Sequence, residues 1–274
     1  MIRREVTLPG GGLGWLLVSQ IEHARLAGAL AAEWGAPPYS AVEPRDELLP
    51  AIVRHDDGWS EWERWPALDP ATGRPRNFLE MPVEDSLLIW RTSIERAEAM
   101  SPLGGATVAG HFLHLLRHGL VWEQHGTRAA AAAHQWGAEF DALRQGWLDE
   151  WSASPIVPGS ARGSLLETAA AAVSWLQFFD RLSLWFCMKE QQEPAELSTC
   201  GGPPLRLAPQ ARSTTECNDG DVLTVKLEPW PLRIPEFEIT LGARLVPARR
   251  YADAAELAAV PWRLMRWRLR LVPE

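Results

Sequence analysis

Apolar residues recur at three- and four-residue intervals through the first two thirds of the chain, a spacing that predicts amphipathic helices. The first helix should begin at a capping box formed by Ser19 and Glu22 and end near Trp34, because Gly35 and two prolines follow. The same spacing predicts further helices at residues 46–56, 86–99, 106–118, 129–151 and 164–188. Residues 59–82 are rich in proline and turn formers, so we expect an ordered excursion there without long regular structure.

After Glu190 the pattern changes to short segments in which apolar and polar residues alternate, as they do in half-buried β-strands. These predicted strands lie at residues 222–227, 237–245 and 262–271. In the last of them Arg266, Arg268 and Arg270 share one face, which is either a solvated sheet surface or a phosphate or partner surface. The pattern therefore predicts a helical part over residues 13–190 and a smaller β-rich part over residues 201–274.

Composition narrows the classes of partner. The 274 residues are 46% hydrophobic, ample for a well-packed core, and the net charge of -8 argues against a nucleic-acid partner. No apolar stretch approaches the roughly 20 residues that span a bilayer, so no membrane partner is expected. The apolar run at residues 13–18 is too short for a targeting segment and the cysteines lack C-x-x-C spacing, which predicts a reduced, cytoplasmic protein. We expect the β-rich part either to cover the functional site or to form a contact between copies of the chain in a homo-oligomer.

Two carboxylates stand in strongly apolar surroundings. His55 and Asp56 end a helix whose earlier residues are mostly apolar, and Asp180 lies in the middle of a helix with apolar neighbours on most sides. Burying an unpaired carboxylate costs several kcal/mol, so each of these acids needs a cation or hydrogen-bond donors. For Asp180 the alternatives are an internal ion pair with an arginine, or a metal ion shared with imidazoles.

Histidines supply further candidate ligands. His111, His114 and His118 share one helix face, as a ligand ladder would, although the same spacing is typical of an ordinary amphipathic helix. His111 is the member of this set that we expect to bind a metal. His23, on the first helix, is either a metal ligand or a partly buried helix histidine.

The order His23, His55-Asp56 and Asp180 resembles the H, HD, D pattern of the HD-domain superfamily of metal-dependent phosphohydrolases. This resemblance implies a mainly α fold, an HD-domain-like helical bundle with a small C-terminal antiparallel β subdomain. A longer string, from about Trp15 to Met188, is similar to an uncharacterised bacterial family, a domain of unknown function. It includes His55-Asp56-Asp57-Gly58-Trp59, Trp62-Glu63, Asp69-Pro70, Gly110-His111-Phe112 and Asp180-Arg181-Leu182-Ser183-Leu184.

The HD resemblance also implies a ligand set and a reaction. His23, His55, Asp56 and Asp180 would bind a divalent Fe, Mn, Zn or Mg ion, and His111 would help to hold a second one. A metal-activated water would then attack a phosphoester. The signalling phosphodiesterases of that superfamily carry a glycine and a lysine after the pair, whereas Asp57-Gly58-Trp59 follows here, so a cyclic-dinucleotide substrate is not supported.

The remaining site assignments concern catalysis and an anionic small-molecule substrate. Asp56 and Arg181 are assigned to catalysis. The groups assigned to substrate binding are three guanidinium groups and one aromatic ring: Arg54, Arg64, Arg76 and Trp59. The alternative for the arginines is a solvated surface position, and the alternative for the tryptophan is packing in the core. We therefore expect a metal-dependent phosphoester hydrolase. The two alternatives are a di-iron oxygenase on the same scaffold and a non-catalytic ligand-binding protein.

Overall fold

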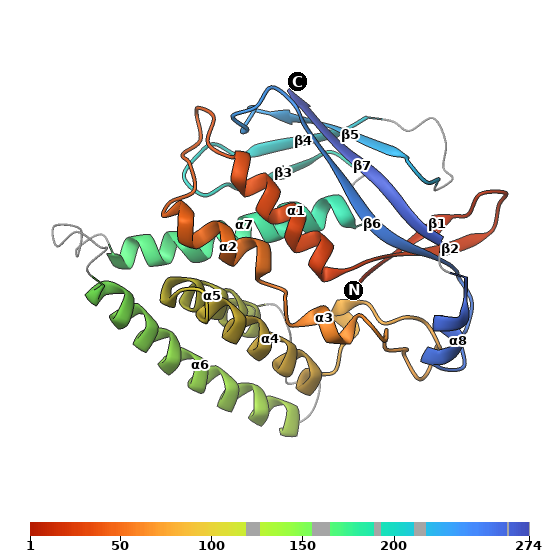
Figure 1. Ribbon diagram of the computed structural model, residues 1–274, viewed down its shortest axis with the longest axis horizontal. Helices are drawn as coiled ribbons and strands as arrows, with labels where there is room; N and C mark the ends of the chain where they lie inside the picture. The colour runs from red at the N-terminus through yellow and green to blue at the C-terminus, as the bar shows by residue number, and fades with distance from the viewer. Residues whose placement is uncertain (119–126, 155–164, 189–192, 211–217, 262, 274) are drawn as a thin grey trace.

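One seven-stranded sheet covers one side of the helices in the computed structural model (Figure 1). The structure describes residues 1–118, 127–154, 165–188, 193–210, 218–261 and 263–273. Two helices, α1 (Gln20–Glu33) and α7 (Leu165–Cys187), lie directly beneath the sheet. On their far side lie α4 (Val83–Glu98), α5 (Pro102–His118) and α6 (Thr127–Ala153). The helices that meet beneath the sheet position the site described below.

The sheet draws its strands from both ends of the chain. Their order across the sheet is β1-β2-β6-β7-β5-β4-β3, and each neighbouring pair is antiparallel except β5 with β7. The strands are β1 (Ile2–Thr7), β2 (Leu13–Val18), β3 (Ala195–Leu197), β4 (Leu205–Pro209), β5 (Val222–Glu228), β6 (Phe237–Pro247) and β7 (Arg263–Pro273).

The expectation of a mainly α, HD-domain-like helical bundle with a small C-terminal antiparallel β subdomain is wrong. The sheet is large and mixed, and β2 lies inside it between β1 and β6. Residues 14–18 of β2 are all buried, so this strand shows no alternation of apolar and polar residues. A strand without that alternation gives no period-two signal, so the sequence pattern does not predict β2.

The predicted long helices are confirmed, with ends displaced by a few residues. The shorter ones are α2 (Arg45–Arg54), α3 (Trp59–Trp62), a 3₁₀ turn (Phe78–Glu80) and α8 (Ala254–Ala259), of which α2 alone is predicted as a helix by the sequence. Residues 59–82 hold only short elements, as expected. Ser164 and Trp262, with which two predicted elements begin, lie outside the described residues.

The ends of α1 follow from its sequence. The Ser19 hydroxyl accepts a hydrogen bond from the Glu22 backbone N–H at 3.0 Å, and Gly35 adopts a φ of +120° just beyond the last turn. The Glu22 carboxylate does not close the capping box. It accepts instead from the Gly242 N–H on β6 at 2.9 Å, which ties the start of α1 to the sheet.

Helix α2 differs from its prediction at the start. Pro44 is its N-cap, rather than Asp46, so Pro50 lies inside the helix and cannot donate a backbone hydrogen bond there. The helix ends at its C-cap, His55, and this early end leaves Asp56 free to turn toward α1.

The arginine row of β7 follows one of its two predicted interpretations. Arg268 and Arg270 form exposed ion pairs with Glu238 and Glu236, so the arginine row of β7 is a solvated sheet face. No helix among the described residues is long and apolar enough to span a bilayer.

Candidate metal centre

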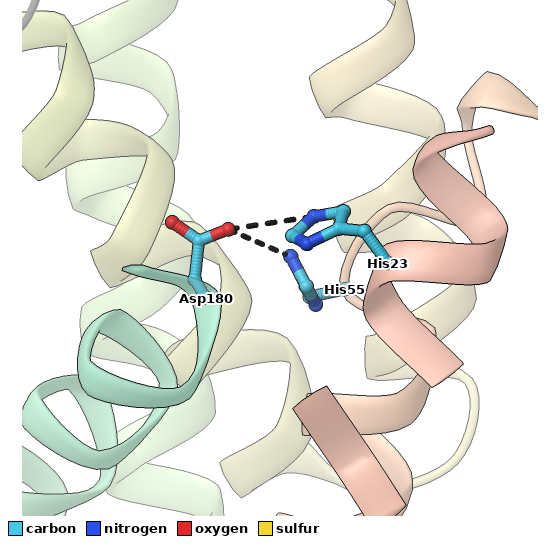
Figure 2. A group of neighbouring side chains, drawn as sticks. All are labelled: His23, His55 and Asp180. Atoms are coloured by element: carbon cyan, nitrogen blue, oxygen red, sulfur yellow. Dashed lines mark ion pairs between the residues drawn. The ribbon is translucent and has the colours of Figure 1, made fainter. Parts of the chain in front are cut away.

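Five buried polar residues meet where α1, α2, α5 and α7 converge. Their exposed fractions are 0% for His23 and His55, 4% for Asp56, 2% for His111 and 8% for Asp180. Figure 2 shows His23, His55 and Asp180 pointing toward one another from three separate helical segments. The residues predicted as metal ligands are thus brought together, although they lie far apart in the sequence.

The imidazoles present their Nε2 atoms to the carboxylates. His23 Nε2 lies 3.1 Å from Asp56 Oδ2 and 3.5 Å from Asp180 Oδ1. His55 Nε2 lies 3.4 Å from Asp180 Oδ1 and 3.6 Å from Asp56 Oδ2. The ligand atoms of His23, His55 and Asp180 all lie within 4.8 Å of one another, which is close enough for one ion to contact all three.

The Nδ1 atoms are held by groups that fix the proton positions. His23 Nδ1 lies 2.7 Å from Ser183 Oγ, and this hydroxyl donates to the Asp180 carbonyl at 3.0 Å, so it accepts from the imidazole. His55 Nδ1 lies 2.8 Å from the Ile52 carbonyl, which can only accept. Both Nδ1 atoms therefore carry hydrogen, and both Nε2 atoms present lone pairs when the rings are neutral.

This arrangement fits a divalent ion. His55 Nε2 is buried and makes no hydrogen bond of ordinary geometry with any residue that the structure describes. A lone pair that faces carboxylate oxygens needs a cation between them, either a proton or a metal ion. Two imidazoles with carboxylates suit Fe, Mn or Zn. In the described part of the chain the ion-pair partners of Asp180 are His23 and His55, which does not support the alternative of an internal arginine.

His111 lies beside this group. Its ring centroid is 5.7 Å from that of His55, and its buried Nδ1 has no hydrogen-bond partner among the described residues. Burial lowers the pKa of His111 to about 4, so the ring is neutral and can offer a lone pair. His114 and His118 point elsewhere, because both are exposed on α5.

The charges of the centre are coupled. Burial lowers the pKa of His55, but the negative charges of Asp56 and Asp180 outweigh that effect and raise it to about 9. Burial raises the pKa of each carboxyl group, and the surrounding imidazoles outweigh it, so the pKa values of Asp56 and Asp180 are lowered. Without a metal the centre therefore holds ionised carboxylates and a protonated His55.

Metal uptake should release about one proton per ion near neutral pH, because His55, with a pKa of about 9, must lose its proton before Nε2 can bind. Below that pKa the metal affinity should fall by about tenfold for each unit of pH decrease, since protons compete for Nε2. Calorimetric titration in two buffers of different protonation enthalpy measures the release. Identical heats in both buffers would contradict it.

Two supporting residues were missed in the sequence. Gln20 Nε2 donates to Asp56 Oδ2 at 3.2 Å, and Ser183 holds His23 as described above. Gln20 precedes His23 by three positions and Ser183 follows Asp180 by three. Polar residues one turn from a candidate ligand on an apolar helix are the signal that identifies them.

The residues assigned to the substrate are dispersed. Arg54 and Arg64 are largely exposed and pair with Asp57 and Glu61, each three positions away. Trp59 is buried in the hydrophobic core. Arg76 is half-buried at a small cavity beside Trp59. The Trp59 backbone N–H donates to the Asp56 carbonyl at 2.9 Å, but no side chain of these four has a described contact with the five buried residues.

Arg181, which was assigned to catalysis with Asp56, is exposed on α7, where its Nε donates to the Gln177 carbonyl at 3.3 Å. Asp56 lies inside the centre and Arg181 lies on the outer surface of the same helix that carries Asp180. The structure thus brings one of the two catalytic candidates to the imidazoles.

The fold and the buried histidine–carboxylate group describe a protein with a candidate metal centre beneath a mixed sheet. Residues 1–248 match a family model described as "Protein of unknown function (DUF3891)", and the chain belongs to this family. No curated protein and no solved structure matches the chain.

Proposed function

We propose that this protein is a metal-dependent hydrolase that cleaves phosphoesters. The observation that carries the proposal is that the buried Nε2 atoms of His23 and His55 converge on the carboxylate oxygens of Asp56 and Asp180. The reaction class rests on the ligand order, since His23, His55-Asp56 and Asp180 follow the sequence pattern of the HD-domain phosphohydrolases.

The ligand set that we propose is His23, His55 and Asp180, completed by Asp56 and His111. A divalent ion held there would polarise a phosphoryl group and lower the pKa of water toward neutrality. Ser183 and Ile52 keep the two Nε2 atoms directed inward, and Gln20 orients the Asp56 carboxylate. Burial excludes bulk water from these charges, which strengthens every electrostatic interaction among them.

Asp56 is the group that we assign to proton transfer. Its lowered pKa keeps it ionised at neutral pH, so it can accept the proton of an attacking water. Asp56→Asn preserves the shape of the side chain and removes the basic oxygen. We expect this change to lower kcat by about 10²-fold or more, the ordinary cost of losing a general base.

The assay is phosphate release from aryl phosphate monoesters and diesters after chelation and reloading with Mn, Fe, Zn or Mg. Asp57→Asn is the matched control, because Asp57 is adjacent in sequence but pairs with Arg54 at the surface. Equal losses in the two variants would refute the role of Asp56. Metal uptake without turnover in any loaded form would refute the hydrolase and favour a ligand-binding protein.

A further inference from the structure

A cavity of about 320 Å³ lies between α5, α6 and α7, apart from the metal centre. Figure 1 shows α5 between α7 and α6, and α5 packs against both. The polar residues that line the cavity are His114, Arg117 and His118 from α5, Asp141 and Arg144 from α6, and Gln177 from α7. Asp141 is the one acid among the described lining residues.

Positive charge collects around this cavity. Arg117 pairs with Asp141, whereas the half-buried Arg144 donates its Nε to a neutral acceptor, the Ala106 carbonyl, at 3.1 Å. Burial lowers the pKa of Arg144, the charge of Asp141 opposes that effect, and the nearby Arg117 adds to it. Asp141 attracts both guanidinium groups, yet two arginines against one acid leave the described lining with a net positive charge that a bound anion would offset.

Gly110 leaves room for the guanidinium group of Arg144. A Cβ at this position would lie 2.6 Å from Val173 Cγ2 and 3.0 Å from Arg144 Nε. Any side chain there would therefore push against Val173 and Arg144. The bare backbone of α5 at Gly110 allows Arg144 to lie across the helix, close to the cavity.

The cavity is one helical turn from two residues of the metal centre. His114 follows His111 by three positions on α5, and Gln177 precedes Asp180 by three positions on α7. Residues three apart lie on neighbouring turns of one helix side. Arg181, next to Asp180, also lies near enough for its charge to act on His114.

We propose that this cavity binds a phosphate group. Arginine forks match the geometry of phosphate oxygens and bind them bidentately, while imidazoles and an amide supply further donors. The identification of that phosphate as part of the hydrolysed substrate rests on the proposed function. Phosphate binding itself does not.

The test is a titration of metal-free, chelator-treated protein with inorganic phosphate at low ionic strength. Arg144→Gln and Arg117→Gln should each weaken binding by about tenfold or more, because each removes a charged hydrogen-bond donor. Asp141→Asn should strengthen binding by up to about fivefold, since it frees Arg117 from its competing carboxylate. Arg206→Gln is the control, because this exposed arginine pairs with Glu228 on the sheet.

Three outcomes would overturn the proposal: no phosphate binding, binding that appears only after metal is restored, or equal affinity in Arg117→Gln, Arg144→Gln and wild type. Arg117 is exposed, so its variant tests the site even if Arg144→Gln misfolds. Because the titration contains no metal, its failure is independent of hydrolysis. Loss of hydrolysis in the metal-centre variants likewise does not test phosphate binding in the cavity.

Discussion

Asp180→Ala should leave the protein without its metal ion and without metal-dependent turnover. Asp180 lies against both His23 Nε2 and His55 Nε2, so its removal takes away the oxygen ligand that the two imidazoles share. It also removes a charge that balances the ion in a buried site. We expect the metal affinity to fall by more than about 100-fold, beyond the usual cost of losing a supporting group.

Elemental analysis after dialysis, followed by competition with a chromophoric chelator, measures this loss. Glu167→Ala is the matched control, because Glu167 is an exposed acid on the same helix, α7. Circular dichroism separates metal loss from unfolding. Wild-type metal content in folded Asp180→Ala would remove this residue from the ligand set.

Gly58→Ala should produce a large loss of stability. A Cβ on Gly58 would lie 2.0 Å from the Ile89 carbonyl oxygen and 2.8 Å from Ser93 Oγ. The Ile89 oxygen belongs to the backbone of α4 and cannot move aside as a flexible side chain would. The hydrogen bond from the Gly58 N–H to Ser93 Oγ, 2.9 Å long, would also be strained. We expect destabilisation by about 2–4 kcal/mol, from overpacking and a weakened buried hydrogen bond.

Gly146→Ala on α6 provides the contrast. Apart from the backbone of α6 itself, no described atom lies within 4 Å of a Cβ at that position, so alanine should stabilise the helix by about 0.5–1 kcal/mol. Thermal and urea unfolding of both variants give the comparison. If Gly58→Ala unfolds at the wild-type midpoint, the close packing of the segment after His55 against α4 is incorrect.

The helices and the centre could be predicted because each produces a local pattern. His55, Asp56 and Asp180 stand out as polar residues in apolar helices, and a buried charge must be compensated wherever the chain folds. His111 could not be separated from His114 and His118 by spacing alone. The part of α5 that reaches His118 is exposed, and this depends on the neighbouring helices rather than on the helix itself.

The sheet could not be predicted in the same way. Strand β2 is buried along residues 14–18, so it resembles a short apolar helix segment, and its partner β6 lies more than 200 residues away in the chain. Only tertiary contacts decide that pairing. For the same reason, sequence analysis singled out Arg54 and Arg64 near the His-Asp pair, although both form local ion pairs on the surface.

The most direct test of the central claim is the X-ray absorption spectrum of the zinc- or manganese-loaded protein. The account predicts scattering from at least two imidazole rings, with nitrogen and oxygen ligands at about 2.0–2.2 Å, and loss of the imidazole contribution in Asp180→Ala. A spectrum with oxygen ligands alone, or one that Asp180→Ala leaves unchanged, would contradict a metal centre at His23, His55 and Asp180.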